Sequence, residues 1–453
     1  MSTIAAIATP DAVGGISVIR ISGDKSTDIA DKIFKPANKK LPSQMEGYTC
    51  SYGFINDEGN NIDDVVLTVF KAPKSYTGED VVEISCHGGR YITKKILRLI
   101  LKNGAEAAMA GEFTKRAFLN GKLSLTQAEA VMDVISSSGE SQLKFANALK
   151  DGAVFKRINN IKSKLVEILS SLAAWADFPE EDVPEVEPEV LMVQIDRVVN
   201  DITKTINTYD DGRIIREGIN TVICGKPNVG KSTLMNCLSG YQRSIVTDIA
   251  GTTRDVIEES VRLGDLTLRL SDTAGIRHTD DIIESMGVDI AYQKINEADL
   301  ILAVFDCTSE LDTKEKELID KIFNKNVVAI VNKIDGEKNI DMDYLKDKFK
   351  FVVEISAKNN DGTEKLISIL EELFINNKSD AYEGIIANER QKQCLEKAYN
   401  NVIEAKEVLQ MGGMLDAVTV CLDSAAINLM ELTGEKASDT VINDVFSRFC
   451  VGK

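Results

Sequence analysis

The residues from Gly225 to Ser232 form the motif with the clearest chemistry, Gly-Lys-Pro-Asn-Val-Gly-Lys-Ser. An apolar stretch, Ile219 to Cys224, precedes this motif, and a helix-like stretch begins at Thr233. In a strand–loop–helix context the glycines let backbone N–H groups surround phosphate oxygens, and the helix N-terminus adds positive potential. Lys231 can reach the β- and γ-phosphates, and the Ser232 hydroxyl can bind Mg²⁺. The motif therefore predicts a nucleoside triphosphate site.

A second motif, Asn332-Lys333-Ile334-Asp335, indicates which base is bound. It follows the apolar run from Val327 to Val331, so it lies where a buried strand ends. An Asp335 carboxylate can accept hydrogen bonds from two N–H groups of guanine, whereas adenine offers no such donor pair. The base recognised is therefore predicted to be guanine.

Two further loops complete the set that is typical of GTP-binding proteins. Ser356-Ala357-Lys358 follows the apolar run from Phe351 to Ile355 and is expected to close over the base. Asp272-Thr273-Ala274-Gly275 follows the run from Leu266 to Leu270 and would place a carboxylate near the metal. The order and spacing of all four motifs predict a GTP site.

Composition limits the possible partners. The chain has 453 residues, with 53 Lys and Arg against 71 Asp and Glu, giving a net charge of −18. This balance argues against a broad electrostatic surface for RNA or DNA, but it leaves room for a local basic groove or for nucleic acid handled through a partner. The start, Met1 to Ala6, has no signal-peptide pattern, and no apolar run is long enough to span a bilayer. We expect a cytoplasmic protein.

The cysteines and histidines do not indicate a disulfide framework or a zinc site. The eight cysteines are scattered with no Cys-x-x-Cys pair, and only His87 and His278 could join them as ligands. Reduced thiols in a bacterial-type cytosol fit this pattern best.

The chain is expected to be multidomain. Residues 1–118 alternate strand-like and helix-like runs and predict an α+β domain. Residues 119–215 and 379–453 have helical periodicity, and we expect them to form one discontinuous all-α domain, although two separate helical domains stay possible. Residues 216–378 alternate strands with helices and predict an inserted α/β P-loop GTPase domain.

Several less general features carry a resemblance to one family. Thr247 to Asp255 reads Thr-Asp-Ile-Ala-Gly-Thr-Thr-Arg-Asp, and an aliphatic Ile276 follows the Asp-Thr-Ala-Gly motif where Ras-like enzymes have glutamine. The stretch from Gly111 to Leu123 and the end, Phe449 to Lys453, are also distinctive. Along its whole length the chain resembles the MnmE (TrmE) family of bacterial tRNA-modification GTPases.

The resemblance implies a K⁺-dependent GTPase. A K⁺ ion bound beside the phosphates can take the place of an arginine that offsets their charge. By resemblance the K⁺ ligands are Asn228, Thr247, Ile249 and Thr252, and the Mg²⁺ ligands are Ser232 and Thr253. The full set of expected GTP-binding residues is Asn228, Val229, Gly230, Lys231, Ser232, Thr233, Thr247, Asp248, Ile249, Ala250, Gly251, Thr252, Thr253, Asp272, Thr273, Ala274, Gly275, Asn332, Lys333, Ile334, Asp335, Ser356, Ala357 and Lys358.

Two residues are catalytic candidates by resemblance. Glu284 aligns with the family's catalytic glutamate, and a carboxylate there could orient the attacking water directly or through a second water. Without the resemblance, Asp280 and Asp281 would compete with Glu284, and any of the three could be a solvated acid. Cys450 lies close to the end of the chain and is either a participant in the modification reaction or an incidental thiol.

The family also implies a 5-formyl-tetrahydrofolate-type ligand in the N-terminal domain. The matching positions are Arg20, Glu83, Lys122 and Lys453. Cationic side chains suit the glutamate tail of folate, and a carboxylate suits the N–H donors of its pterin ring. Taken singly, each could be an ordinary surface charge.

The partners implied by resemblance are a second copy of this chain, the FAD-binding protein MnmG and, through that complex, tRNA. The reaction implied is addition of an aminomethyl or carboxymethylaminomethyl group at C5 of the wobble uridine. Two alternatives stay open: a ribosome-assembly or regulatory GTPase without modification activity, and a folate-dependent one-carbon transferase with an attached GTPase.

Overall fold

The computed structural model describes residues 1–177, 187–241, 259–264, 266–271, 293–374 and 384–453. Within these residues the chain divides into two compact units. The first comprises Met1–Met132, Leu149–Thr203 and Gln393–Lys453, and the second comprises Asp133–Ala148 and Lys204–Lys392.

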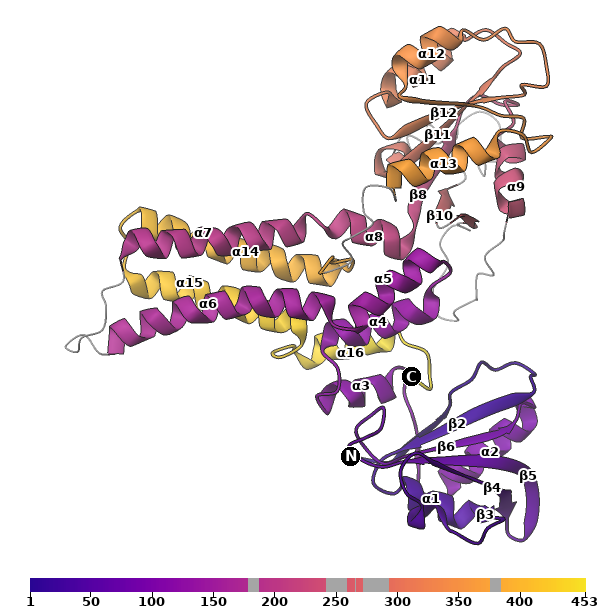
Figure 1. The fold of residues 1–453 in the computed structure, drawn as a ribbon, viewed down its shortest axis with the longest axis vertical. Helices are drawn as coiled ribbons and strands as arrows, with labels where there is room; N and C mark the ends of the chain where they lie inside the picture. Colours follow the sequence, from indigo (N-terminus) through magenta and orange to yellow (C-terminus); the bar gives the residue numbers. More distant parts are fainter. Residues whose placement is uncertain (178–186, 242–258, 265, 272–292, 375–383) are drawn as a thin grey trace, which may run out of the picture. The chain divides into compact units, whose positions relative to one another are not determined.

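The first unit contains a seven-stranded sheet in the order β3-β4-β5-β6-β2-β1-β7. All neighbouring strands are antiparallel except β1 and β7, and helices α1 and α2 cover one face (Figure 1). Apolar side chains of both helices and of the inward strand positions form one core. The elements are β1 (Ile4–Ile7), β2 (Ile16–Ser22), α1 (Ser26–Ile33), β3 (Phe34–Pro36), β4 (Thr49–Asp57), β5 (Asn60–Phe70), β6 (Val81–His87), α2 (Arg90–Lys102) and β7 (Glu106–Ala107).

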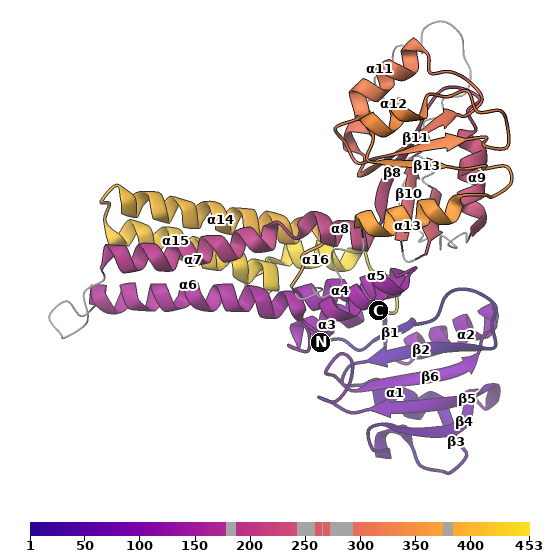
Figure 2. The ribbon, with the colours of Figure 1, turned by 45° about the horizontal axis from the view of Figure 1, so that its top comes forward.

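Long helices from distant parts of the sequence lie side by side in both views (Figures 1 and 2). Two ion pairs join the early and late helical segments: Lys162 to Glu435 at 2.6 Å and Lys406 to Asp196 at 2.6 Å. These contacts support our proposal of one discontinuous helical domain. The helices are α3 (Glu112–Leu119), α4 (Leu125–Ser136), α5 (Glu140–Lys150), α6 (Ala153–Asp177), α7 (Pro188–Ile206), α14 (Glu389–Gln410), α15 (Leu415–Thr433) and α16 (Asp439–Ser447).

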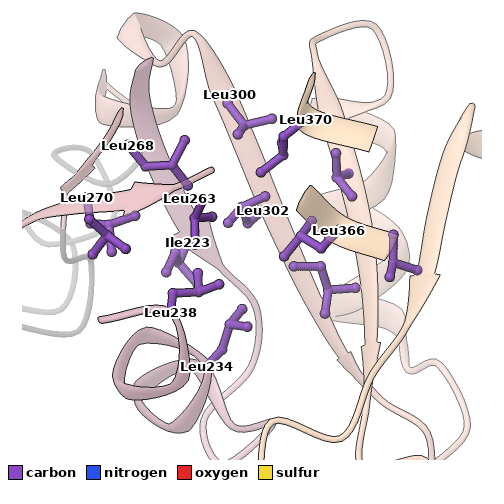
Figure 3. Close-up of a cluster of buried hydrophobic side chains, with 14 of the residues drawn as sticks. Ile223, Leu234, Leu238, Leu263, Leu268, Leu270, Leu300, Leu302, Leu366 and Leu370 are labelled. Carbon is purple, nitrogen blue, oxygen red and sulfur yellow. The ribbon is translucent and has the colours of Figure 1, made fainter. Parts of the chain in front are cut away.

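The second unit contains a six-stranded sheet in the order β13-β12-β11-β8-β10-β9, parallel except at β9. Apolar clusters pack on both faces of the sheet. Figure 3 shows one of them, where Leu234 and Leu238 of α9 approach Ile223 of β8. The elements are α8 (Tyr209–Glu217), β8 (Ile219–Cys224), α9 (Lys231–Tyr241), β9 (Glu259–Leu263), β10 (Leu266–Ser271), β11 (Leu300–Asp306), α11 (Thr313–Ile322), β12 (Val327–Asn332), α12 (Met342–Lys348), β13 (Phe351–Glu354) and α13 (Thr363–Phe374).

The predicted fold class, with an α+β part, a helical part and an α/β part, is confirmed. Four short helices, α1, α3, α8 and α16, were not predicted. Within the helical segment expected over residues 119–215, the part from Leu125 to Asp177 is divided into three helices. One division falls at Ser137–Gly139, and the other at Gly152, whose φ of +88° favours glycine. No helix among the described residues is long and apolar enough to cross a membrane.

Within the early helical segment, Asp133–Ala148 groups with the second compact unit. Arg216 binds Asp133 at 2.7 Å, and Gln142 donates to the Arg216 carbonyl at 3.4 Å. The division into three domains stays our proposal. Helix α5 contacts α8, which directly precedes the first strand of the α/β part.

Candidate functional site

The loop between β8 and α9 has a backbone that only glycine can form at two points. Gly225 has a φ of +141°, and a Cβ there would collide with the Val304 carbonyl of β11. Gly230 has a φ of +99°, and a Cβ there would collide with the side-chain amide of Asn332. Asn228, between them, is left-handed with a φ of +64°. The loop is thus held close to the neighbouring strands, with its N–H groups free of side-chain obstruction.

Lys231 begins helix α9 and folds back over this loop. Its Nζ donates to the carbonyls of Gly225 at 2.7 Å and Lys226 at 2.6 Å. The ammonium group therefore lies where it can neutralise phosphate charge, beside the positive end of the helix. Ser232 and Thr233 follow in the first turn of α9, and both are exposed. An accessible hydroxyl in this position is a suitable Mg²⁺ ligand.

Asn332 at the end of β12 connects the phosphate loop to the base loop. Its Nδ2 donates to the Val229 carbonyl at 2.9 Å, and its Oδ1 accepts from the Ala357 N–H at 3.0 Å. The residue is only 3% exposed. Both bonds are therefore shielded from water, and leaving either partner unsatisfied would be costly.

Asp335 and Ser356 meet at the expected base position. The Ser356 hydroxyl donates to Asp335 Oδ1 at 2.7 Å, and this bond lowers the pKa of the Asp335 carboxyl. Asp335 is exposed, so its ionised carboxylate is accessible to a ligand. Nearby, Lys333 has a φ of +67° and its Nζ binds Asp306 Oδ2 at 2.6 Å. The described loops thus bring together the groups that would bind phosphate and guanine, and the donor set fits GTP and Mg²⁺.

Eleven of the 24 predicted GTP-binding residues lie outside the described residues, as does the catalytic candidate Glu284. These positions are Thr247, Asp248, Ile249, Ala250, Gly251, Thr252, Thr253, Asp272, Thr273, Ala274, Gly275 and Glu284. Their expected roles as K⁺, Mg²⁺ and GTP ligands, and the catalytic role of Glu284, stay predictions.

Lys226 was not singled out from the sequence. Its Nζ binds Asp312 at 2.7 Å and Glu315 at 2.8 Å, the two residues that cap helix α11. This side chain therefore fixes the phosphate loop to a neighbouring helix. Its position within the Gly-x-x-x-x-Gly-Lys-Ser motif gave no signal, because the pattern accepts any residue there.

A second group of predicted residues meets in the first unit. Arg20 on β2 and Glu83 on β6 are directly opposite in the strand register, and Arg20 Nη2 binds Glu83 Oε1 at 2.8 Å. The guanidinium carbon lies 5.5 Å from the ring centres of both Tyr76 and Phe113. An arginine fixed by a carboxylate and two rings is preorganised to bind a planar or anionic group.

The C-terminal segment brings Lys453 to the same place. The Arg20 Nη1 donates to the Gly452 carbonyl at 3.3 Å, and the Phe113 N–H donates to the Lys453 carbonyl at 3.1 Å. Gly452 has a φ of +97°, and a Cβ there would collide with the Ile7 carbonyl. Burial, and then the charge of Arg20, lower the pKa of Lys453. Arg20, Glu83 and Lys453 therefore form one cluster.

The structure places Lys122 and Cys450 at the edges of this cluster. Lys122 is exposed and donates to the Pro73 carbonyl at 3.0 Å, in the loop that also carries Tyr76. It also lines a hollow of about 540 Å³. Cys450 is exposed, and its carbonyl accepts from Gly111 N–H at 3.4 Å. No described contact assigns chemistry to the Cys450 thiol.

Sequence reasoning missed the support beneath this cluster. Arg116 is 4% exposed and binds Glu79 at 3.2 Å and Glu112 at 2.9 Å, and it also donates to the Ser2 carbonyl at 2.7 Å. Tyr76 bonds Thr114 at 2.9 Å, and burial is the main reason that its pKa is raised. Arg116 and Glu79 are 37 residues apart and Tyr76 and Thr114 are 38 apart, so these two contacts leave no local pattern. The pair of Glu112 and Arg116 has i,i+4 spacing on α3 and is the one local signal that could have been found.

His87 lies on the surface of the first unit. It ends β6, and its Nδ1 lies 2.7 Å from Asp63 Oδ1. The hydrogen bond to Asp63 raises the pKa of His87. His87 therefore belongs to a surface ion pair of β5 and β6.

Known proteins match this chain along most or all of its length. A model described as "GTP-binding protein TrmE N-terminus" matches residues 3–122, and one described as "MnmE helical domain" matches residues 125–450. The tRNA modification GTPase MnmE of Carboxydothermus hydrogenoformans is 42% identical over 457 residues, covering 100% of this chain and 99% of the relative. The chain belongs to the MnmE family. The tRNA modification GTPase MnmE of Thermoanaerobacter pseudethanolicus is 43% identical over 456 residues, covering 100% of this chain and 99% of the relative.

Solved structures resemble the MnmE-family chain over a smaller part. Aquifex aeolicus Era bound to GDP and AlF₄⁻ is 27% identical, with a TM-score of 0.29, covering 40% of this chain and 66% of that protein. The FeoB G-domain of Methanococcus jannaschii is 22% identical, with a TM-score of 0.25, and the match covers 34% of this chain and 96% of that domain.

Proposed function

We propose that this protein is a GTP hydrolase that acts in the modification of tRNA wobble uridine. The observation that carries the proposal is the buried Asn332 bridge. It joins a glycine loop that accepts phosphate to a loop in which Ser356 and Asp335 are set to recognise guanine. Full-length relatives named tRNA modification GTPase at 42–43% identity support the cellular role.

Hydrolysis is proposed to need K⁺. The resemblance that implies K⁺ includes Ile276 in place of a water-orienting glutamine. The described side of the site contributes Asn228, which is exposed and left-handed at the tip of the glycine loop. Its amide oxygen suits a monovalent cation, which would offset charge on the β–γ bridge. Thr247, Ile249 and Thr252 are proposed to complete the ligand set, with Glu284 orienting water and Thr253 joining Ser232 at Mg²⁺.

The first unit is proposed to bind a 5-formyl-tetrahydrofolate-type ligand. The clustering of Arg20, Glu83 and Lys453 supports this, because two cations and a carboxylate on aromatic walls suit a pterin with an acidic tail. Lys122 would contribute from the loop edge. The Cys450 thiol is proposed as a participant in the modification step.

The proposed assembly is a homodimer that joins the FAD-containing protein MnmG and receives tRNA through that complex. The product would be a 5-carboxymethylaminomethyl or 5-aminomethyl uridine. The proposed assembly and the proposed product both depend on membership of the MnmE family and on the cluster of Arg20, Glu83 and Lys453.

Two experiments test the function. Nucleosides from tRNA of a strain lacking this chain should lose C5-modified wobble uridine, and their persistence would refute the role in modification. Purified protein should hydrolyse GTP faster in K⁺ than in Na⁺ at equal ionic strength. Equal turnover in the two salts would refute K⁺ dependence alone.

A further inference from the structure

Helix α2 carries an unusual concentration of positive charge for this chain. From Gly88 to Ala105 there are five Lys and Arg residues and no Asp or Glu, although the whole chain has a net charge of −18. The inward face of the helix, Thr93, Ile96, Leu99 and Ile100, is buried against the sheet. The charge is therefore confined to the outward face, which consists of Arg90, Tyr91, Lys94, Lys95, Arg98 and Lys102. We call this set the α2 basic face.

Local carboxylates neutralise only part of the α2 basic face. Asp11 contacts Arg90 at 3.5 Å and Lys94 at 3.1 Å. Glu58 contacts Lys102 at 3.1 Å. Five cations thus face three carboxylates, because the charge of Asp57 also acts on Lys102. Lys95 and Arg98 form no ion pair with any residue that the structure describes.

The shape of the face matches its charge. The side chains of Arg90, Tyr91, Lys94, Lys95 and Arg98 line a hollow of about 300 Å³. Tyr91 is 76% exposed, whereas tyrosine is usually only partly exposed. Cations that track a backbone, next to an aromatic ring on which a base can stack, are the combination that binds RNA.

We propose that this chain contacts tRNA directly, with the α2 basic face binding backbone phosphates and Tyr91 stacking on an unpaired base. This inference deepens the proposed function and rests on it for the identity of the RNA. It differs from that function in one respect: tRNA would not be held by the partner protein alone. An acidic protein surface would satisfy the cations equally, but it would give no role to an exposed aromatic ring.

The test measures binding of an unmodified tRNA transcript to the full-length chain without nucleotide. Fluorescence anisotropy gives the affinity at salt concentrations from about 50 to 200 mM. Each lost phosphate contact lowers the salt slope of log affinity by about 0.7 to 0.9. Lys95→Glu with Arg98→Glu should therefore lower the slope by about 1.5 and weaken binding at least about tenfold. Tyr91→Ala should weaken binding about fivefold or more with an unchanged slope.

The matched control is Lys35→Glu with Lys40→Glu, which makes the same change of charge on exposed residues of the same unit. This variant should keep both affinity and slope. An unchanged slope in Lys95→Glu/Arg98→Glu, an equal loss in both double variants, or no transcript binding by the wild-type chain would each overturn the inference. Unchanged GTP turnover in all variants would show that they are folded.

The outcome can be separated from failure of the proposed function. If the deletion strain keeps its modified uridines while transcript binding depends on the α2 basic face, the function fails and the RNA surface stands. If modification is lost in the deletion strain but restored fully by Lys95→Glu/Arg98→Glu, the function stands and the RNA surface is refuted.

Discussion

Replacing Asn332 with alanine should weaken nucleotide binding sharply, because one buried amide holds two loops. The substitution leaves the Val229 carbonyl and the Ala357 N–H without their partners, at 2.9 Å and 3.0 Å in the native protein. Each buried group left unsatisfied costs about 1–3 kcal/mol. Two such groups give a central value of about 4 kcal/mol, which corresponds to a Kd weaker by roughly 700-fold if the cost falls on the bound state.

The assay is fluorescence titration with a mant-labelled GDP, with urea unfolding measured in parallel to separate affinity from stability. Asn332→Asp keeps an oxygen to accept from Ala357 but places a carboxylate against the Val229 carbonyl, so its loss should also be large. Asn326→Ala is the matched control, because Asn326 is exposed and donates a single 3.3 Å bond to the Asp299 carbonyl. Its Kd should change by less than about threefold.

The result that refutes this reasoning is a folded Asn332→Ala protein whose Kd matches that of Asn326→Ala. The phosphate and base loops would then hold their positions without the Asn332 amide. If Asn332→Ala lowers stability but not nucleotide affinity, the unsatisfied groups cost the free and the nucleotide-bound protein equally. That result would also contradict a role of the Asn332 bridge in nucleotide binding.

Three other perturbations follow from the geometry. Asp335→Asn should shift preference from guanosine toward xanthosine nucleotides, measured by competition. Arg116→Ala should lower the free energy of unfolding by about 3 kcal/mol, because Glu79 and Glu112 lose a buried partner; Arg448→Ala, at an exposed pair, should change it by less than about 0.5 kcal/mol. Asp63 raises the pKa of His87, so the protonated pair stabilises the fold below about pH 6.5 and this contribution is lost as pH rises through the raised pKa. Urea unfolding should therefore separate wild type from His87→Gln more at low pH than at high pH.

Each of these three has a contradicting outcome. An unchanged guanosine preference in Asp335→Asn would remove that residue from base recognition. Equal unfolding midpoints for Arg116→Ala and Arg448→Ala would mean that the buried cluster contributes no more than a surface pair. A difference between wild type and His87→Gln that grows toward high pH would reverse the expected sign for His87.

The parts of the site that sequence could predict are those specified within a few neighbouring residues. Gly225 and Gly230 are required by a local backbone shape, and an apolar run before Asp335 indicates a strand that ends at the base. Strand alternation and helical spacing likewise predicted that residues 1–118 contain both strands and helices, as β5, β6 and α2 do. Such patterns repeat every two or 3.6 residues and so can be detected without tertiary information.

The parts that could not be predicted depend on contacts across long separations. Arg20 was placed at a ligand site by resemblance alone, and nothing near it in sequence indicates Phe113 or Gly452 as neighbours. Lys226 illustrates the same limit, since its carboxylate partners lie more than 80 residues later on α11. Short helices such as α16 were missed because nine residues hold only about two and a half turns of periodic signal.

The contact between Arg20 and the Gly452 carbonyl has a consequence for biosynthesis. The two residues are 432 positions apart, so the N-terminal sheet leaves the ribosome long before residues 450–453 are translated. During that interval the Arg20 guanidinium has its Glu83 partner but lacks the Gly452 carbonyl. A nascent chain would thus hold only the part of the cluster that the sheet carries, and the cluster would be completed only after translation has passed through the intervening GTPase domain.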